Sequence, residues 1–255
     1  MSHFPSLSLR DLSAQVELET NKGPDGIGLI APYDFVLDQE YWEWIPANVP
    51  LYITRTPFLD ERVGIGMAAR VSEDEVLAAA ARELVIANPA VTAFACTSGS
   101  YVHGLVGEER CRQAILAGGA QQALTTSGAL LEALTALAVR RIAVATPYNA
   151  STTTRLVDFL GEAGFGVVSC AFLGLESDIF RLTPDTVNRL VRAADCADAE
   201  AIFISCTNLR TREVISTLEH ELGKTVISAN QVTVWSALKA ANISVDLPDQ
   251  RLFAI

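Results

Sequence analysis

A stretch of sequence near the start of the chain recurs in its second half, and this repeat limits the possible folds most strongly. GLIAPYD at residues 28–34 resembles AVATPYN at residues 143–149, and VTAFACTS at residues 91–98 resembles AIFISCTN at residues 201–208. A third, weaker pair is LTTS at residues 124–127 and VISA at residues 226–229. The three pairs occur in the same order at similar separations, which indicates two copies of one structural half.

The segments between these motifs alternate between two patterns. Short runs rich in Val, Ile and Ala occur at residues 27–31, 51–54, 91–95, 142–145, 167–172, 201–205 and 226–228. They lack strict alternation, as strands buried on both faces do. Longer amphipathic patterns predict helices at residues 72–87, 127–138, 151–163, 183–194, 211–222 and 231–241. Ser72 and Glu75 have the spacing of a capping box at the first of these helices.

This alternation predicts an α/β protein with parallel sheets. We expect two pseudo-symmetric, three-layer α/β/α halves with the active site in the crevice between them. Residues 21–122 with 230–255 are assigned to the first half, and residues 123–229 to the second. The C-terminal helix is therefore expected to return to the first half.

Composition narrows the range of partners. The chain of 255 residues is 50% hydrophobic, which is enough for a full core, and its net charge is −11. Nucleic acid and anionic membranes both require a basic face, so they are not expected as partners. A small anionic ligand interacts only with the local charge of its site, so the net charge does not exclude it as a partner. No run of 18 apolar residues and no apolar signal core is present, so we expect a cytoplasmic protein with reduced thiols.

Two of the five cysteines belong to the repeat. Cys96 and Cys206 each directly follow an apolar strand, where parallel α/β sheets bind their ligands. If the halves face each other, the two thiols lie on opposite walls of one crevice. Cys111, Cys170 and Cys196 have no repeat partner and are expected to be ordinary small side chains. No Cys-x-x-Cys pair occurs and only three histidines are present, so we expect no metal.

Small polar residues follow both cysteines. Backbone N–H groups and a helix N-terminus at these loops would lower the pKa of a thiol and stabilise a developing enolate. The hydroxyls of Thr97, Ser98 and Thr207 and the amide of Asn208 have the chemistry to bind substrate carboxylates. We therefore predict a two-cysteine site that binds a small carboxylic acid.

At these motifs the sequence resembles the aspartate/glutamate racemase superfamily. The segments ACTS at residues 95–98, SCTNLRT at residues 205–211 and TPY at residues 146–148 are similar to its branch of maleate cis-trans isomerases, arylmalonate decarboxylases and ectoine-utilisation proteins. The resemblance implies an enzyme without a cofactor, forming dimers or tetramers. It also implies that Cys96 adds to an alkene, that Cys206 transfers the proton, and that Tyr148 helps to hold the carboxylates.

Within this branch the motifs favour an isomerase. In the decarboxylases glycine replaces the first cysteine, whereas Cys96 is present here. The amino-acid racemases usually carry other residues after their cysteines. A racemase or epimerase and a decarboxylase remain alternatives. An alternative of a different class is a small-molecule-binding protein without turnover, because a fold does not fix a function.

The loop after the first strand departs from the isomerase pattern. Those enzymes carry Pro-Ser-Ser-Asn where this chain has Pro32-Tyr33-Asp34-Phe35, and a second Asn expected near Glu176 is also absent. We expect Pro32, Tyr33 and Asp34 to line the site. An ionised Asp34 would repel a carboxylate, so the substrate is expected to be larger, less anionic or cationic.

Three further features have open roles. The glycine-rich residues 99–107 predict a mobile flap over the site. Arg55 follows the second predicted strand and His103 lies near Cys96 in sequence, and each could either reach the site or be an ordinary surface residue.

Overall fold

The computed structural model describes residues 9–12, 26–245 and 247–255, and it contains two parallel four-stranded sheets. The strand order is β2-β1-β3-β4 in the first sheet and β6-β5-β7-β8 in the second. The strands of the first sheet are β1 (Ile27–Ala31), β2 (Leu51–Arg55), β3 (Val91–Phe94) and β4 (Ala123–Thr125). Those of the second are β5 (Arg141–Tyr148), β6 (Gly166–Leu175), β7 (Ala201–Ile204) and β8 (Thr225–Ser228).

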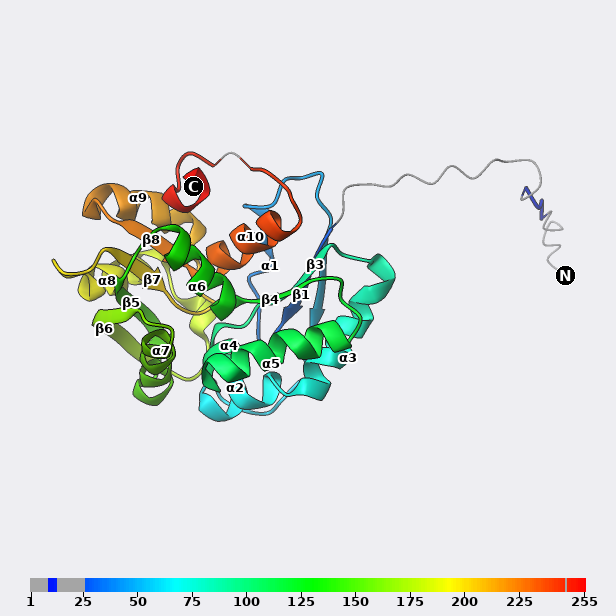
Figure 1. The fold of residues 1–255 in the computed structure, drawn as a ribbon, viewed down its shortest axis with the longest axis horizontal. Coiled ribbons are helices and arrows are strands. Elements are labelled where there is room, and N and C mark those ends of the chain that lie inside the picture. Colours follow the sequence, from blue (N-terminus) through cyan, green and yellow to red (C-terminus); the bar gives the residue numbers. More distant parts are fainter. Residues whose placement is uncertain (1–8, 13–25, 246) are drawn as a thin grey trace, which may run out of the picture.

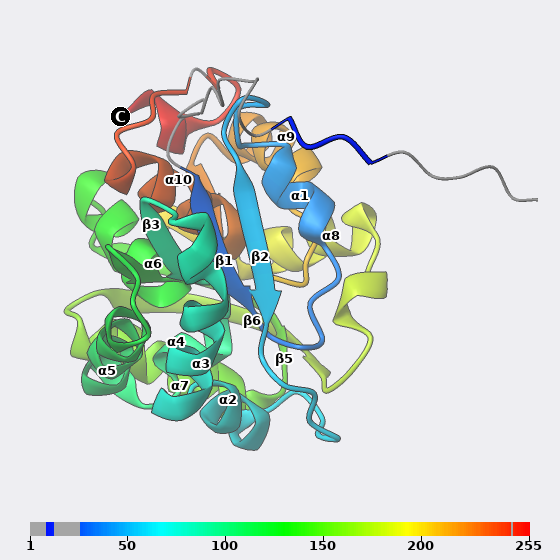
Figure 2. The same ribbon diagram turned by 90° about the vertical axis from the view of Figure 1, so that its right-hand side faces the viewer.

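Helices surround both sheets (Figure 1). The α-helices are α1 (Asp38–Trp42), α2 (Ile65–Val71), α3 (Asp74–Leu84), α4 (Thr97–Tyr101), α5 (Gly104–Ala117), α6 (Thr126–Ala136), α7 (Ala150–Glu162), α8 (Pro184–Ala194), α9 (Arg212–Leu222) and α10 (Ala229–Ala240). Three short 3₁₀ helices are η1 (Val85–Ala87), η2 (Ile179–Arg181) and η3 (Arg251–Ala254). Figure 2 shows β2 at the outer edge of the first sheet, with β1 behind it.

The predicted fold class is confirmed, and the internal repeat explains the topology. The two strand orders are the same when β1 to β4 are matched with β5 to β8 in sequence order. The related motifs therefore occupy equivalent places: Tyr33 and Tyr148 lie at the ends of the first strands, and Cys96 and Cys206 follow the third strands. Parallel pairing then brings these ends to the same edge of each sheet: Ile30 pairs with Phe94, and Ala145 with Ile204.

Polar side chains fix the starts of several helices. The side chains of Thr125, Asn149 and Thr183 accept hydrogen bonds from backbone amides of α6, α7 and α8. Ser228 and Gln231 form a capping box at α10. The capping box predicted at Ser72 is wrong. That hydroxyl instead donates to the Ala68 and Ala69 carbonyls of the preceding helix α2, at 2.9 and 3.0 Å.

The glycine-rich segment is not the flap that we predicted. Residues 97–101 and 104–117 form helices α4 and α5, joined at Gly104 in the left-handed region (φ 69°). A Cβ at Gly99 would lie 2.8 Å from the Phe94 ring and 3.1 Å from the Cys96 sulfur. Gly99 therefore permits close packing behind the first cysteine.

One continuous apolar cluster joins the two sheets. It includes Leu29 and Ala93 of the first sheet with Val144 and Phe203 of the second. Helix α10 contacts β3 and β4 as well as β8, and it lies with α6 between the sheets in Figure 1. No helix among the described residues is both long and apolar enough to span a bilayer.

One boundary of the predicted halves needs correction. We assigned residues from 123 onward to the second half, but β4 pairs with β3 in the first sheet. The remaining assignment stays a prediction, and its residues 21–25 lie outside the described residues.

Candidate active site

The two repeat cysteines are buried at the carboxyl ends of equivalent strands. Cys96 follows β3 and Cys206 follows β7, with exposed fractions of 4% and 5%. The two thiols interact electrostatically, because the charge of Cys206 raises the pKa of Cys96. The fold therefore brings together two residues that are 110 positions apart in the chain.

Cys96 caps the short helix α4. Its sulfur accepts a hydrogen bond from the Gly99 amide at 3.4 Å and lies 3.9 Å from the Ser98 hydroxyl. Burial raises the pKa of the Cys96 thiol to about 12, although these two contacts lower it. Loss of hydration thus outweighs the local hydrogen bonds, and the free protein holds Cys96 as a thiol.

Cys206 has an unusual backbone conformation. Its φ is 93°, in a region that residues other than glycine rarely adopt. The Asn208 amide donates to its sulfur at 3.4 Å, and the Tyr148 hydroxyl donates to the same sulfur. Burial nevertheless raises the pKa of the thiol to about 12, so Cys206 is also a thiol in the free protein.

Polar groups without partners lie at the same place. One carboxyl oxygen of Asp34 and the Thr97 hydroxyl are buried without a hydrogen-bond partner among the described residues. The charge of Asp34 raises the pKa of both thiols, and its backbone carbonyl is bonded to Asn208, two residues after Cys206. Burial raises the pKa of Asp34 itself. Buried groups left without partners are rare in proteins and are costly, so this arrangement can accept polar groups of a ligand.

Several predicted binding residues have other partners. The Asn208 side chain donates to the Asp34 carbonyl (3.0 Å) and accepts from the Val36 amide (3.1 Å). It therefore fastens the loop after β1 to the loop after β7. The Tyr33 hydroxyl donates to the Glu61 carbonyl at 2.9 Å, and its ring meets Phe58. The Pro32 carbonyl accepts from the Phe35 amide and closes the turn. The Thr207 carbonyl accepts from Asn230 at 2.9 Å.

Arg55 and His103 are engaged elsewhere. The Arg55 guanidinium pairs with Asp38 at 2.6 Å and donates to the Phe35 carbonyl. His103 is exposed just before α5, and its pKa is lowered by desolvation and by Arg110 and Arg155. Neither residue is among the groups that shift the pKa of a site cysteine.

Sequence reasoning missed three residues that shape the site. Tyr101 is buried, and both cysteines raise its pKa; its position one helical turn beyond the Cys96 motif was an available signal. Glu40 accepts hydrogen bonds from the Thr211 hydroxyl (3.0 Å), the Arg212 amide (2.7 Å), the Thr211 amide and Asn230. No motif marks Glu40. Asn230 directly follows the third repeat segment, but nothing in the sequence indicates its contact with Glu40, since both residues act across the fold.

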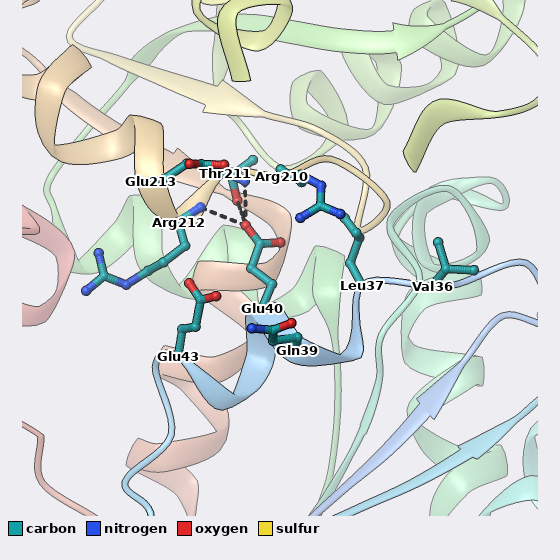
Figure 3. A pocket seen from close by; sticks show the side chains of 9 residues that line it. All are labelled: Val36, Leu37, Gln39, Glu40, Glu43, Arg210, Thr211, Arg212 and Glu213. Carbon is teal, nitrogen blue, oxygen red and sulfur yellow. Dashed lines mark hydrogen bonds between the residues drawn. The ribbon is translucent and has the colours of Figure 1, made fainter. Parts of the chain in front are cut away.

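Figure 3 shows Glu40 reaching the start of α9 beside a cavity of about 270 Å³. The cavity is lined by Val36, Leu37, Gln39, Glu40, Glu43, Arg210, Thr211, Arg212 and Glu213. The side chain of Glu40 thus connects α1 to the loop that carries Cys206.

Two named relatives match most of the chain. The arylmalonate decarboxylase of Bordetella bronchiseptica is 30% identical over 204 residues, covering 77% of this chain and 85% of its own. The maleate isomerase of Nocardia farcinica is 30% identical over 174 residues, covering 65% and 69%.

Solved structures show the same fold. A double mutant of arylmalonate decarboxylase in the liganded form superposes with a TM-score of 0.82 at 28% identity, covering 90% of this chain and 98% of that one. A mutant of the Nocardia farcinica maleate cis-trans isomerase with a covalently bound succinylcysteine intermediate has a TM-score of 0.79 at 23% identity, covering 90% and 98%.

The family described as arylmalonate decarboxylase (Amdase) matches residues 45–252. The relatives include an arylmalonate decarboxylase and a maleate isomerase, and both are enzymes. With its duplicated sheets and its buried pair of thiols, the chain belongs to the arylmalonate decarboxylase family.

Proposed function

We propose that this protein is a cofactor-independent cis-trans isomerase that acts on a small unsaturated carboxylic acid through Cys96 and Cys206. The observation that carries the proposal is the pair itself: two buried thiols follow equivalent strands and lie close enough to interact electrostatically. The Nocardia farcinica maleate isomerase is a relative at 30% identity, and its solved mutant holds a succinylcysteine. A thiol adduct of that kind is what addition of a cysteine to maleate produces.

In the proposed reaction Cys96 adds to the substrate and later leaves it, and Cys206 donates a proton and later removes it. The Cys96 thiolate attacks one alkene carbon, so a C–S bond forms and the π electrons move toward the carboxylate as an enolate. Cys206 then gives its proton to the neighbouring carbon and becomes a thiolate. The central bond is now single and rotates. Cys206 takes the proton back, the double bond forms again, and the C–S bond breaks to release the Cys96 thiolate.

The protonation state of Cys206 suits this role, because a thiol with its pKa near 12 is a proton donor at neutral pH. The hydrogen bond from Tyr148 stabilises the thiolate that forms. Cys96 requires a lower pKa than it has in the free protein, and groups of the bound substrate have to supply the difference.

We propose that hydroxyl groups hold the substrate carboxylate. The Thr97 hydroxyl is buried without a partner among the described residues, and Ser98 and Thr207 are buried beside the two cysteines. Asn208 supports the site through its backbone amide and through the loop that its side chain fastens.

Decarboxylation is the second candidate. The Bordetella bronchiseptica decarboxylase covers more of this chain than the isomerase does. In that reaction a substrate C–C bond breaks with loss of CO₂, and a single thiol, here Cys206, would protonate the resulting enolate. Cys96 would then be dispensable, whereas isomerisation requires both thiols.

Proton NMR in D₂O with a panel of unsaturated, saturated chiral and malonic acids separates these candidates. Interconversion of cis and trans acids is the expected result, abolished separately by Cys96→Ser and Cys206→Ser. Mass spectrometry after an acid quench should detect a substrate adduct on Cys96. Release of CO₂ that survives Cys96→Ser would instead establish the decarboxylase. Deuterium exchange at a saturated centre would establish a racemase, and binding without turnover would establish a binding protein.

A further inference from the structure

Asp34 is the feature of the site that the proposed reaction leaves unexplained. It follows β1 and is half-buried as a residue, and one of its carboxyl oxygens is buried without a hydrogen-bond partner among the described residues. The charge of this carboxyl raises the pKa of both reacting thiols. An acid in this position would make each thiolate harder to form.

The backbone that carries the Asp34 carboxyl group is held in place. The Asp34 carbonyl accepts from the Asn208 side chain at 3.0 Å, and the same side chain accepts from the Val36 amide at 3.1 Å. The backbone on both sides of the carboxyl is therefore fixed from the loop that carries Cys206. The side chain of Asp34 therefore starts from a fixed backbone position next to the loop of Cys206.

Two arginines of the neighbouring elements pair with other acids. Arg55 pairs with Asp38 at 2.6 Å, and Arg212 pairs with Asp249 at 3.0 Å. Arg210 is exposed and lines the cavity beside Glu40. Within the described parts of the chain, no salt bridge involves Asp34. A buried carboxylate with no counter-ion is costly, and a ligand that brings a cation would remove that cost.

We propose that Asp34 selects a substrate that carries a protonated nitrogen, an ammonium or amidinium group, close to the carbon that meets the cysteines. This inference rests on the proposed function, because it takes Cys96 and Cys206 as the reacting groups. The nitrogen donates to the unpartnered oxygen of Asp34. The substrate carboxylate binds the hydroxyl groups of Thr97, Ser98 and Thr207. The same positive charge offsets the field of Asp34 at both sulfurs, so substrate binding itself makes the Cys96 thiolate accessible.

Two four-carbon cis alkenes that share one carboxylate test the proposal: (Z)-4-aminobut-2-enoate, which ends in an ammonium group, and maleate, which ends in a second carboxylate. Their affinities are measured by calorimetry at pH 7 on the Cys96→Ser/Cys206→Ser variant, which cannot carry out the proposed chemistry. The aminobutenoate is expected to bind roughly 10- to 100-fold more tightly than maleate, as a charge-assisted hydrogen bond allows.

Replacing Asp34 then shows whether it is the source of the preference. Adding Asp34→Asn keeps the shape and removes the charge, so the preference for the ammonium ligand should disappear. Asp38→Asn, a nearby acid already paired with Arg55, is the matched control and should leave the preference unchanged. If the variant with Asp34→Asn failed to fold, the ratio of affinities in the protein with native Asp34 would still decide the proposal.

Equal or tighter binding of maleate, or no binding of the aminobutenoate, would overturn the inference; tighter maleate binding would show instead that Asp34 is protonated and donates to a carboxylate. Binding is measured without turnover. Failure to detect a Cys96 adduct in the wild-type protein would therefore count against the proposed reaction. The comparison of the two affinities would still test the role of Asp34.

Discussion

The backbone of Cys206 sets this residue apart from Cys96. Its φ of 93° is costly for any residue with a Cβ, whereas Cys96 has a φ of −139°. We predict that Cys206→Gly unfolds at higher urea concentration than Cys206→Ala, by about 1 kcal/mol in the free energy of unfolding. Both variants lack the thiol, so the comparison isolates the backbone.

Cys96 provides the control for that comparison. In its extended conformation glycine has no advantage, so Cys96→Gly should be less stable than Cys96→Ala. The same order of stabilities at both positions would contradict the argument.

The raised pKa of both site thiols predicts slow alkylation. At pH 8 a thiol with a pKa of about 12 has roughly a thousandfold less thiolate than one at 9.0. Iodoacetamide should label Cys170 before Cys96 and Cys206 because Cys170 is exposed, although burial raises the pKa of Cys170 as well, and labelling of Cys96 and Cys206 should accelerate as the pH rises. Peptide mass spectrometry measures the order, and early labelling of Cys96 would show that its thiolate forms in the free protein.

The raised pKa of Asp34 predicts a pH-dependent stability. An acid whose pKa is higher in the folded than in the unfolded protein stabilises the fold below its unfolded pKa, near 3.8, and this contribution is lost as the pH rises through the folded value. The stability of Asp34→Asn relative to the wild type should therefore increase as the pH rises from 4 to 8. Thermal unfolding at both pH values measures it, and parallel curves would refute it.

Among the elements, α1 is joined to the start of α9 through the side chain of Glu40, and this contact should stabilise the fold. Glu40→Ala removes the acceptor of the first amides of α9 and of Asn230, leaving buried donors without partners. We expect a loss of about 2–4 kcal/mol in urea unfolding. Glu43→Ala changes an exposed acid on the same cavity and should cost less than about 0.5 kcal/mol. Similar losses in the two variants would count against the role of Glu40.

The elements that sequence alone could predict are those with a local signal. Apolar runs located most of the strands, and the recurring Pro-Tyr and Cys-Thr pairs indicated the duplicated sheets before any contact was known. The glycines near Cys96 misled because the same residue permits both mobility and close packing, and only the positions of Phe94 and the Cys96 sulfur decide between them.

The contacts that complete the site have no local signal. Asn208 bonds to Asp34 across 174 positions, and Glu40 bonds to Thr211 across 171. Contacts between residues so far apart leave no periodic pattern in a single sequence, so they cannot be predicted from it. The residue types were recognised as polar candidates, but which of them bind a ligand and which bind each other depends on how the two sheets meet.

At the scale of the whole molecule, the shared apolar cluster predicts a single unfolding transition. All three tryptophans lie outside residues 123–229, so their fluorescence reports mainly on the first sheet and its neighbours. Far-UV circular dichroism reports on both sheets. Because the cluster includes residues of both, the two signals should change at the same urea concentration. Separate midpoints would show that the halves unfold independently.

The identical strand orders also have an evolutionary consequence. A single-sheet ancestor could have reached this arrangement as a symmetric homodimer, but its two sulfurs would then have been chemically equivalent. Joining the copies in one polypeptide released them from that symmetry. Within one polypeptide the two positions are free to differ: Cys96 has an ordinary backbone and Cys206 a left-handed one, a difference that suits the separate roles we propose for them.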